Sequence, residues 1–403
     1  MIEPKQFYRE LDAVLSTINK EKSDEGFFVT ILNVLEEKFG EVLQIRDSHV
    51  YEQRGDDFVF LDTSPQQQDS AIARSIPVQS QGIQQVMKKG VVVFDQPGLL
   101  EGFDLKIDFE SITVAAIVVQ NPVRKWLLVF EIEKGRVRED VMLFLNAVQT
   151  AINYRLFSEM MQNDLKRAEE IQKSLLPKQA PKVAGYQIYG HSQPAELVGG
   201  DFFDFFQFSD EDFGGCIGDA SGHGLPAALL VRDVVVGLRM GLAKEMRLVH
   251  TLNKLNHVIQ QSTYATNFVS IFVGEIESEG HLFYVNAGHP PPFLVSGKSI
   301  QDLSATGITL GFLPDINLRR SYIWMPPESV LVLFSDGIIE RHRNVNVEDQ
   351  YGIDRLKKLV TENRRLSAKE IVQLVFKKVY EFAKRTPWDD DATLVVVKRL
   401  AEE

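Results

Sequence analysis

The alternation of hydrophobic and polar residues divides the chain into two regions of mixed helix and strand, connected by one long helical stretch. In the first region, apolar residues recur every three or four positions over residues 4–22 and again over about 25–39, which predicts two helices. Turn residues then separate several short apolar runs, and these runs predict strands. The strands are expected at 42–46, 58–61, 90–94, 112–120 and 126–132, with a helix at 79–88.

Residues 138–176 contain neither glycine nor proline and predict a helix of unusual length. One interpretation is two consecutive helices at the edge of a domain. The other is a connecting helix that pairs with a second copy of the chain, because part of it has the heptad spacing of a coiled coil. The seam has Gln172 at a core position and consists of Met161, Leu165, Ala168, Gln172 and Leu175.

In the second region, strands and helices follow one another without the strict alternation of a parallel α/β fold. The predicted fold class is therefore α+β, with strands and a few long helices forming a sandwich. Strands are expected at 186–191, 202–208, 214–218, 268–276, 282–287, 292–295, 320–324, 330–335 and 393–397, and helices at 225–242, 249–262, 353–363 and 368–386. The predicted domains are an N-terminal helix (1–22), an α+β unit (23–137), a linker helix (138–183) and a second domain (184–403).

Composition limits which binding partners and which cellular compartment we expect. The formal net charge of −12 argues against nucleic acid or an anionic membrane as the main partner. The single cysteine, Cys216, excludes an internal disulfide framework and fits a reducing compartment. The first residues lack the pattern of a signal peptide, and no apolar run approaches the length of a membrane span. We therefore expect a cytoplasmic protein.

One glycine-rich stretch, Gly218-Asp219-Ala220-Ser221-Gly222-His223-Gly224-Leu225-Pro226, places an aspartate between a predicted strand and a predicted helix. An aspartate beside glycine is usual in a turn. Asp201, Asp336 and Asp390 also lie at ends of predicted strands, where carboxylates can converge. Converging carboxylates repel one another unless a cation lies between them, and all-oxygen ligands favour Mg²⁺ or Mn²⁺ over Zn²⁺. Two such ions can activate water for attack on a phosphoryl group.

Five motifs occur in the order found in the PPM (PP2C-like) serine/threonine phosphatases, and they most resemble the bacterial SpoIIE/RsbU branch. The resemblance covers about residues 165–400. It implies a PPM-type sandwich of two packed antiparallel sheets flanked by helices. The motifs are Val198–Asp204, Gly218–Pro226, Asn286-Ala287-Gly288-His289-Pro290-Pro291, Ser335-Asp336-Gly337 and Asp390-Asp391-Ala392-Thr393.

The resemblance also implies a catalytic centre with two Mn²⁺ or Mg²⁺ ions. Asp219 would bridge the ions, helped by the backbone carbonyl of Ala220, and Asp201 would serve one ion directly or through water. Asp336 and Asp390 would serve the other ion. Asp201 and Asp219 are thus the expected catalytic residues. The family usually has threonine where Ile339 stands, which affects a local contact and not the metal ligands.

Several neighbouring side chains leave both a functional and a structural interpretation open. His223 could act as a general acid, although we favour a structural role in its turn, and His289 resembles a turn residue. Asp204 could support the metal site or be an ordinary strand carboxylate. Asp391 either tunes the neighbouring ligand or is simply exposed. Cys216 lacks the arginine that a cysteine phosphatase needs six residues later, so it is not expected to be a nucleophile.

The N-terminal region resembles a GAF-type sensory domain in its order of helices and strands. A dimerisation unit without a ligand is an equally open interpretation. The resemblances together imply a phosphatase regulated by this domain and acting on a phosphorylated STAS-type anti-sigma-factor antagonist in a partner-switching pathway. We expect a homodimer through the GAF-like domain and the linker helix. The alternative is a catalytically silent partner-switching scaffold with the same fold, and the acidic balance and the missing P-loop disfavour a nuclease or cyclase.

Overall fold

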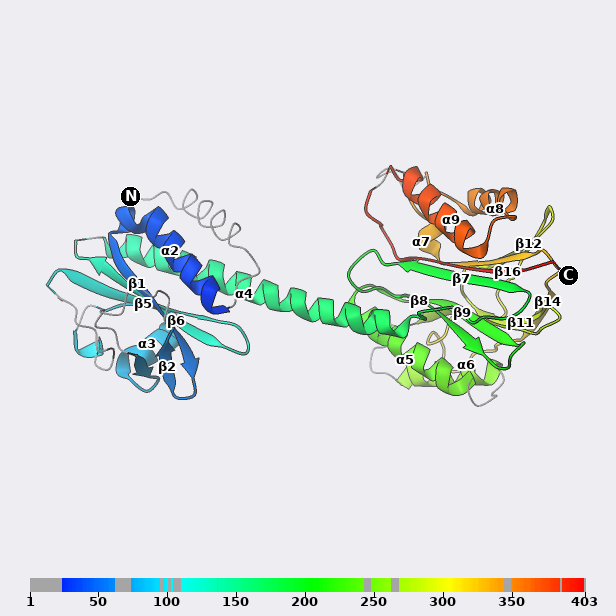
Figure 1. Ribbon diagram of the computed structural model, residues 1–403. Coiled ribbons are helices and arrows are strands. Elements are labelled where there is room, and N and C mark those ends of the chain that lie inside the picture. Colours follow the sequence, from blue (N-terminus) through cyan, green and yellow to red (C-terminus); the bar gives the residue numbers. More distant parts are fainter. Residues whose placement is uncertain are drawn as a thin grey trace. The chain divides into compact units, whose positions relative to one another are not determined.

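The chain forms two compact units, Met1–Asn163 and Asp164–Glu403, and each is described by itself (Figure 1). The computed structural model describes residues 24–61, 74–94, 97–100, 103, 110–135, 137–242, 248–261, 268–343, 349–384 and 386–401. The helix predicted at 4–22 lies outside the described residues. None of the described helices is both long and apolar enough to cross a membrane.

The first unit is built on one antiparallel sheet with the strand order β3-β2-β1-β6-β5-β4. Its strands are β1 (Ile45–Arg54), β2 (Asp57–Phe60), β3 (Ser75–Pro77), β4 (Val91–Phe94), β5 (Ile112–Gln120) and β6 (Lys125–Glu133). Its helices are α2 (Asp24–Leu43), α3 (Gln81–Lys89) and the short 3₁₀ helix η1 (Pro97–Leu100), and α4 (Arg138–Leu175) begins in this unit.

Helices cover both faces of this sheet. Phe28 of α2 and Phe144 of α4 pack with Trp126 on one face, whereas Ile83 of α3 packs with Val129 on the other. Because β5 and β6 are buried on both faces, their sequences are continuous apolar runs. The strand predicted at 42–46 was wrong in its start, since α2 continues to Leu43 and its apolar stripe extends to that residue.

The second unit contains two antiparallel sheets with the strand orders β14-β11-β10-β9-β8 and β13-β12-β15-β16-β7. Its strands are β7 (Tyr186–Gln193), β8 (Asp201–Gln207), β9 (Phe213–Ala220), β10 (Val269–Ile276), β11 (His281–Ala287), β12 (Phe293–Ser296), β13 (Ser299–Asp302), β14 (Ser321–Trp324), β15 (Val330–Phe334) and β16 (Ala392–Arg399). Its helices are α5 (Leu225–Leu242), α6 (Leu248–Gln261), α7 (Asp336–Ile339), α8 (Ile353–Glu362) and α9 (Ala368–Phe382), together with the end of α4.

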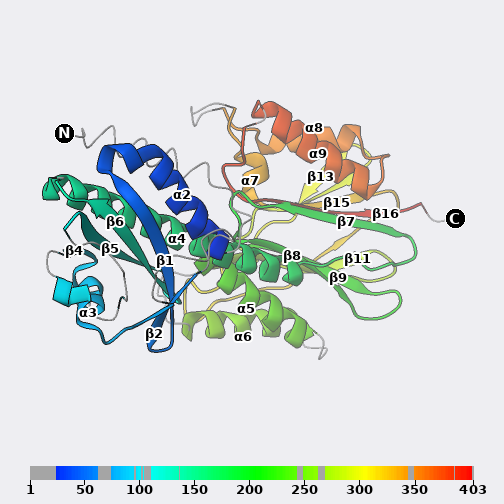
Figure 2. The same ribbon diagram turned by 60° about the vertical axis from the view of Figure 1, so that its left-hand side comes forward.

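The two sheets pack face to face, and each carries a helix pair on its outer face (Figure 2). Helices α5 and α6 bury residues such as Val234 and Leu252 against the first sheet. Helices α8 and α9 bury Leu356 and Val375 against the second. The predicted α+β sandwich with flanking helices is confirmed. Two elements of this unit were missed: β13 because all of its residues are exposed, and α7 because it is a single turn.

Candidate active site

The strand pairings bring the predicted aspartates to one end of the two sheets. Asp201 at the start of β8 lies directly opposite Asp219 at the end of β9. In the other sheet, β15 and β16 pair, so Asp336 just after β15 lies near Asp390 just before β16. The structure therefore places the four predicted carboxylates in one region, although they are as many as 189 positions apart in the sequence, from Asp201 to Asp390.

Ser335 connects the two sheets at this site. Its hydroxyl donates a hydrogen bond to Asp201 Oδ2 at 2.6 Å and accepts one from the backbone N–H of Thr393 at 2.8 Å. Its own backbone N–H donates to the Thr393 carbonyl at 3.0 Å. Since Asp201, Ser335 and Thr393 are almost completely buried, this network holds Asp201 in one position.

Asp391 is a positioning residue rather than an exposed neighbour of Asp390. Its Oδ1 accepts a hydrogen bond from the N–H of Ala195 at 2.8 Å, and its Oδ2 accepts one from the N–H of Gly200 at 2.6 Å. A Cβ atom at Gly199 would lie 2.2 Å from Asp391 Oδ2, so only glycine allows this close approach. Asp391 therefore fixes the loop that leads into Asp201.

Burial and mutual repulsion make this cluster electrostatically unusual. Burial, together with the negative charges of Asp336 and Asp390, raises the pKa of Asp219 to about 7. Burial also raises the pKa of Asp201 well above its ordinary range, with Asp219 as the next cause. The pKa values of Asp336 and Asp390 are raised too, mainly by burial. Such a cluster is stabilised when a cation compensates its charge.

The donor set fits hard divalent cations. Every predicted side-chain ligand is a carboxylate, and the carbonyl oxygen of Ala220 lies beside them, because a Cβ at Gly200 would meet it at 2.5 Å and Asp219 Oδ1 at 3.0 Å. Glycine at this position keeps the space next to both oxygens open. Among the described residues, no three acidic, histidine or cysteine side chains are already close enough to hold one ion. The carboxylates thus share one electrostatic site.

Sequence reasoning missed Arg341, which holds the loop that carries Asp390. This arginine is 2% exposed, and its Nη2 donates to the carbonyl oxygens of Thr386 at 2.7 Å and Pro387 at 2.5 Å. Its Nη1 lies 2.8 Å from Asp389 Oδ2, and the guanidinium carbon lies 5.0 Å from the centre of the Trp388 ring. No sequence signal distinguishes it from the basic residues around it, because an arginine between Glu340 and a histidine is usually exposed.

The remaining candidates have structural surroundings. His223 is exposed, with Nδ1 3.5 Å from Glu196 Oε1, whereas His289 is buried and its Nδ1 lies 2.9 Å from Ser270 Oγ. Burial lowers the pKa of His289 to about 3, so this ring is neutral. Asp204 is buried and forms an ion pair of 2.7 Å with Arg239, away from the other aspartates.

Cys216 is also buried, and burial raises the pKa of its thiol well above the ordinary range. A thiol that stays protonated is a poor nucleophile. The expectation that Cys216 does not act as a phosphatase nucleophile therefore agrees with its surroundings.

The end of α4 touches the loop that precedes Asp201. Gln172 Oε1 accepts a hydrogen bond from the N–H of Gly199 at 3.0 Å, and Gln172 Nε2 donates to the Gly199 carbonyl. The carbonyl of Leu175 accepts a hydrogen bond of 2.6 Å from Arg239, the partner of Asp204. The amide of Gln172 is thus used within the second unit, and its place in a coiled-coil seam stays a prediction.

Comparison with known proteins identifies the class of the second unit. Residues 209–400 match the family model of stage II sporulation protein E (SpoIIE). This is a serine/threonine phosphatase domain of the SpoIIE/PP2C type. Its fold is also that of the SiaA-PP2C domain of Pseudomonas aeruginosa, which aligns with a TM-score of 0.53 at 16% identity, over 60% of this chain and 98% of that one.

Two curated relatives of the SpoIIE/PP2C-type domain come from bacteria. The chain is 28% identical to phosphoserine phosphatase RsbU of Bacillus subtilis (strain 168) over 257 residues, which is 63% of this chain and 75% of RsbU. It is 25% identical to protein IcfG of Synechocystis sp. over 297 residues, which is 66% of this chain. The chain covers only 46% of IcfG, so IcfG contains much that has no counterpart in the alignment.

Proposed function

We propose that this chain is a protein-serine/threonine phosphatase that uses two Mn²⁺ or Mg²⁺ ions held by Asp201, Asp219, Ala220, Asp336 and Asp390. The observation that carries the proposal is the convergence of four aspartates with raised pKa values at one end of the sandwich. A serine/threonine phosphatase domain of the SpoIIE/PP2C type and an alignment with a phosphoserine phosphatase support the same chemistry.

In this mechanism the protein provides a rigid acidic frame. Asp219 would lie between the two ions, Asp336 and Asp390 would hold one of them, and the carbonyl of Ala220 would add an oxygen ligand. When bound, divalent cations supply Lewis-acid activation of water and of the phosphate ester. Asp201, fixed by Ser335, would offer a carboxylate oxygen beside Asp219, and Asp391 keeps the loop before Asp201 in place.

The proposed substrate is a phosphorylated STAS-type anti-sigma-factor antagonist in a partner-switching pathway. This follows from the resemblance to the SpoIIE/RsbU branch and is supported by the alignment with phosphoserine phosphatase RsbU. The cytoplasm, where such regulators and their phosphorylated forms are found, is the proposed compartment.

Regulation is proposed to come from the first unit, a GAF-like domain, through α4 and a homodimer. Met161 and Ile171 of α4 are 51% and 59% exposed in a single chain, which leaves apolar surface for a second copy. At its end the same helix bonds the loop before Asp201 through Gln172. A change in the pairing of α4 can therefore reach the proposed metal site through a short chain of contacts.

The catalytic proposal is tested by hydrolysis of p-nitrophenyl phosphate and of a phosphoserine protein with added Mn²⁺. We expect the wild type to be active, and Asp219→Asn and Asp336→Asn to be inactive while still folded. Equal hydrolysis rates for the wild type and the variants would contradict the metal mechanism. A wild type that binds a STAS-domain protein but hydrolyses neither substrate would instead favour the silent scaffold.

The regulatory proposal is tested separately with Leu165→Pro, which interrupts α4. The expected result is a change in oligomeric state, measured by light scattering, together with a change in phosphatase activity on the protein substrate. Activity on p-nitrophenyl phosphate reports whether the catalytic unit is intact. If oligomeric state and regulated activity both stayed as in the wild type, α4 would not carry the signal.

A further inference from the structure

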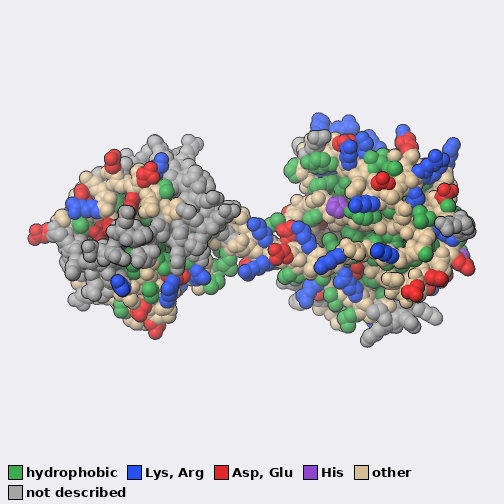
Figure 3. All heavy atoms as spheres, viewed as in Figure 1, with side chains coloured by type: hydrophobic (Ala, Val, Ile, Leu, Met, Phe, Trp, Pro, Cys, Tyr) green, Lys and Arg blue, Asp and Glu red, His purple; other side chains and the backbone are tan. Residues whose placement is uncertain are grey.

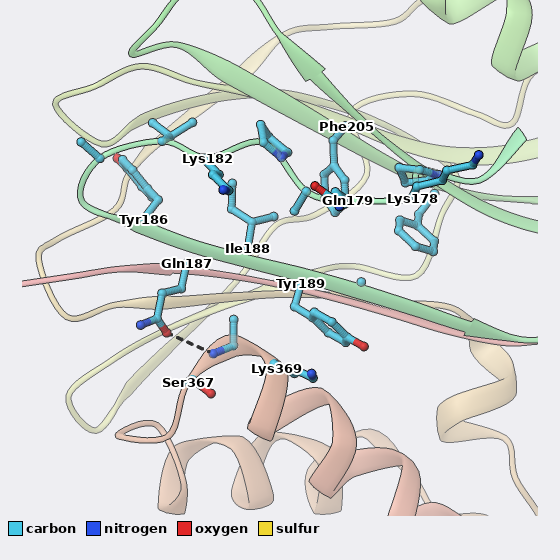
Figure 4. Close-up of a pocket in the computed structure, with 18 residues that line it drawn as sticks. Lys178, Gln179, Lys182, Tyr186, Gln187, Ile188, Tyr189, Phe205, Ser367 and Lys369 are labelled. Atoms are coloured by element: carbon cyan, nitrogen blue, oxygen red, sulfur yellow. Dashed lines mark hydrogen bonds between the residues drawn. The ribbon is translucent and has the colours of Figure 1, made fainter.

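A groove of about 780 Å³ lies in the second unit, outside the acidic site (Figure 4). Residues 177–184 form one wall, strand β7 forms the floor, and the start of α9 forms the other wall. Tyr186, Tyr189 and Phe205 contribute aromatic surface. Gln187 bridges floor and wall, because its Oε1 accepts a hydrogen bond from the N–H of Ala368 at 3.3 Å. The groove is thus long, partly apolar and built on an extended strand.

Strand β7 is the last strand of its sheet, and no described strand pairs with its outer edge. Leu400 N donates to the Gly185 carbonyl at 2.7 Å, so Gly185 and Leu400 form a hydrogen-bonded pair of the antiparallel ladder with β16. Such pairs alternate with pairs whose backbone groups point away from the partner strand. By this alternation, the N–H and C=O groups of Ile188 and Gly190 face the open edge, inside the groove.

The charged side chains that line the groove are all positive. Lys178, Lys182 and Lys369 line the groove, and no aspartate or glutamate does. All three lysines are exposed, and none of them has an ion-pair partner among the described residues. Glu370 in the first turn of α9 accepts hydrogen bonds from Ser367 and caps this helix, and it does not line the groove. The groove is therefore positively charged, whereas the whole chain has a net charge of −12.

Space-filling views agree with this picture of the second unit. In Figure 3, a band of Lys and Arg side chains crosses the middle of one face of this unit, with hydrophobic side chains between them. Unpaired edge strands usually carry charges that discourage pairing with another chain. Here the charges are of one sign, so they repel basic strands and attract acidic ones.

We propose that this groove binds an extended acidic segment of a partner protein, which adds as a strand to the open edge of β7. Backbone hydrogen bonds to Ile188 and Gly190 would hold the segment, and alternate acidic side chains would meet Lys178, Lys182 or Lys369. The other end of β7 pairs with Ala392 and Thr393, next to Asp391. A partner docked on β7 is therefore held beside the catalytic end of the domain.

The test is selection from a library of random peptides of about ten residues, displayed on phage and panned against the full chain. We expect enrichment of peptides rich in Asp and Glu alternating with β-branched residues. Synthetic copies of the selected peptides should bind the variant K178E/K182E/K369E at least about tenfold more weakly. The matched control K298E/K358E/K377E changes net charge equally at exposed lysines outside the groove, and should bind as the wild type does.

A second pair of variants tests strand addition. Ile188→Pro removes an N–H that faces the open edge and should weaken binding several-fold, whereas Ile188→Val keeps the N–H and should not. Hydrolysis of p-nitrophenyl phosphate should be unchanged in both lysine variants. The proposal is overturned if no peptide is enriched, if enriched peptides are not acidic, if the groove variant binds them like the wild type, or if both triple variants lose binding equally.

Discussion

Two charged regions of the second unit, the acidic cluster beside the start of β16 and the basic groove on β7, are built in opposite ways. The acidic cluster is partly buried, from the buried Asp201 to the exposed Asp390, and it is held by the backbone N–H groups of Ala195 and Gly200, by Ser335 and by the guanidinium of Arg341. The lysines of the groove are exposed and have no ion-pair partner among the described residues.

The difference shows what each kind of charge can do. Burying carboxylates together is costly, and the cost appears as raised pKa values, so such a cluster persists where it holds cations for chemistry. Exposed, flexible lysines cost little and act through attraction over a distance. The acidic region is suited to catalysis and the basic one to recognition.

The largest effect is expected when the carboxylate of Asp219 is removed. Asp219→Asn should lower kcat for p-nitrophenyl phosphate with Mn²⁺ by about a thousandfold or more, because several kcal/mol of transition-state stabilisation depend on bound metal. Asp302→Asn, in the exposed hairpin β12–β13, is the control and should keep wild-type kcat. A similar modest loss in both variants would contradict the contrast.

The cost of the buried charges should be visible as a pH dependence of stability without metal. The pKa of Asp219 rises from 3.8 to about 7 on folding, so between about pH 4 and pH 7 the folded state keeps a proton that the unfolded chain releases. Stability is therefore lost as pH rises through this range, by at most about 4 kcal/mol from this residue.

The measurement is chemical denaturation in the presence of a chelator. Asp219→Asn should be more stable than the wild type above pH 7, and the two should converge near pH 4. Added Mn²⁺ should stabilise the wild type above pH 7 and have a much smaller effect on the variant. A constant difference between the two proteins from pH 4 to pH 8 would show that Asp219 keeps its ordinary pKa.

The support around the acidic cluster is tested by Arg341→Met, which removes the guanidinium that holds the 386–389 loop. We expect Mn²⁺ affinity, measured by titration calorimetry, to fall about 10- to 100-fold, as is usual when outer partners of metal ligands are lost. Arg343→Met is the matched control, since Arg343 is 46% exposed and pairs with Asp349. Lower thermal stability with unchanged Mn²⁺ affinity would make Arg341 purely structural.

The smallest effect is expected where α4 meets the cluster. Gln172→Leu removes two hydrogen bonds to Gly199 and should change kcat about three- to tenfold, because each bond contributes about 1 kcal/mol. Gln162→Leu, an exposed position of the same helix, should leave kcat as in the wild type. Equal kcat in the two variants would show that the hydrogen bonds of Gln172 do not contribute to catalysis.

Much of the fold could be predicted because its elements have strong periodicity. The helix expected at 225–242 is α5, because apolar residues repeat along it at helical spacing. The strand expected at 112–120 is β5, because it is a continuous apolar run. Elements with weak patterns were missed. All of β13 is exposed, and the start of β1 was hidden because Leu43 continues the apolar stripe of α2.

The site could be predicted only as far as its local motifs reach. Asp201, Asp219, Asp336 and Asp390 were found because each stands in a glycine-rich or strand-end motif, and their role as metal ligands stays a prediction. The residues that hold them were not found. The sequence leaves two interpretations of Asp391 open, and Arg341 stands in no motif, because the roles of both depend on partners far away in the sequence.

The sequence by itself determined which residues have the chemistry: oxygen ligands beside glycines, a long helix without breaks, and lysines at 178, 182 and 369. Only the tertiary structure decided how they are grouped. Pairing of β8 with β9 set Asp201 opposite Asp219, Ser335 joined the two sheets, and the end position of β7 left its outer edge open between three lysines. The physical reason is that burial, hydrogen bonding and the electric field depend on distances in space, which strand order and packing determine.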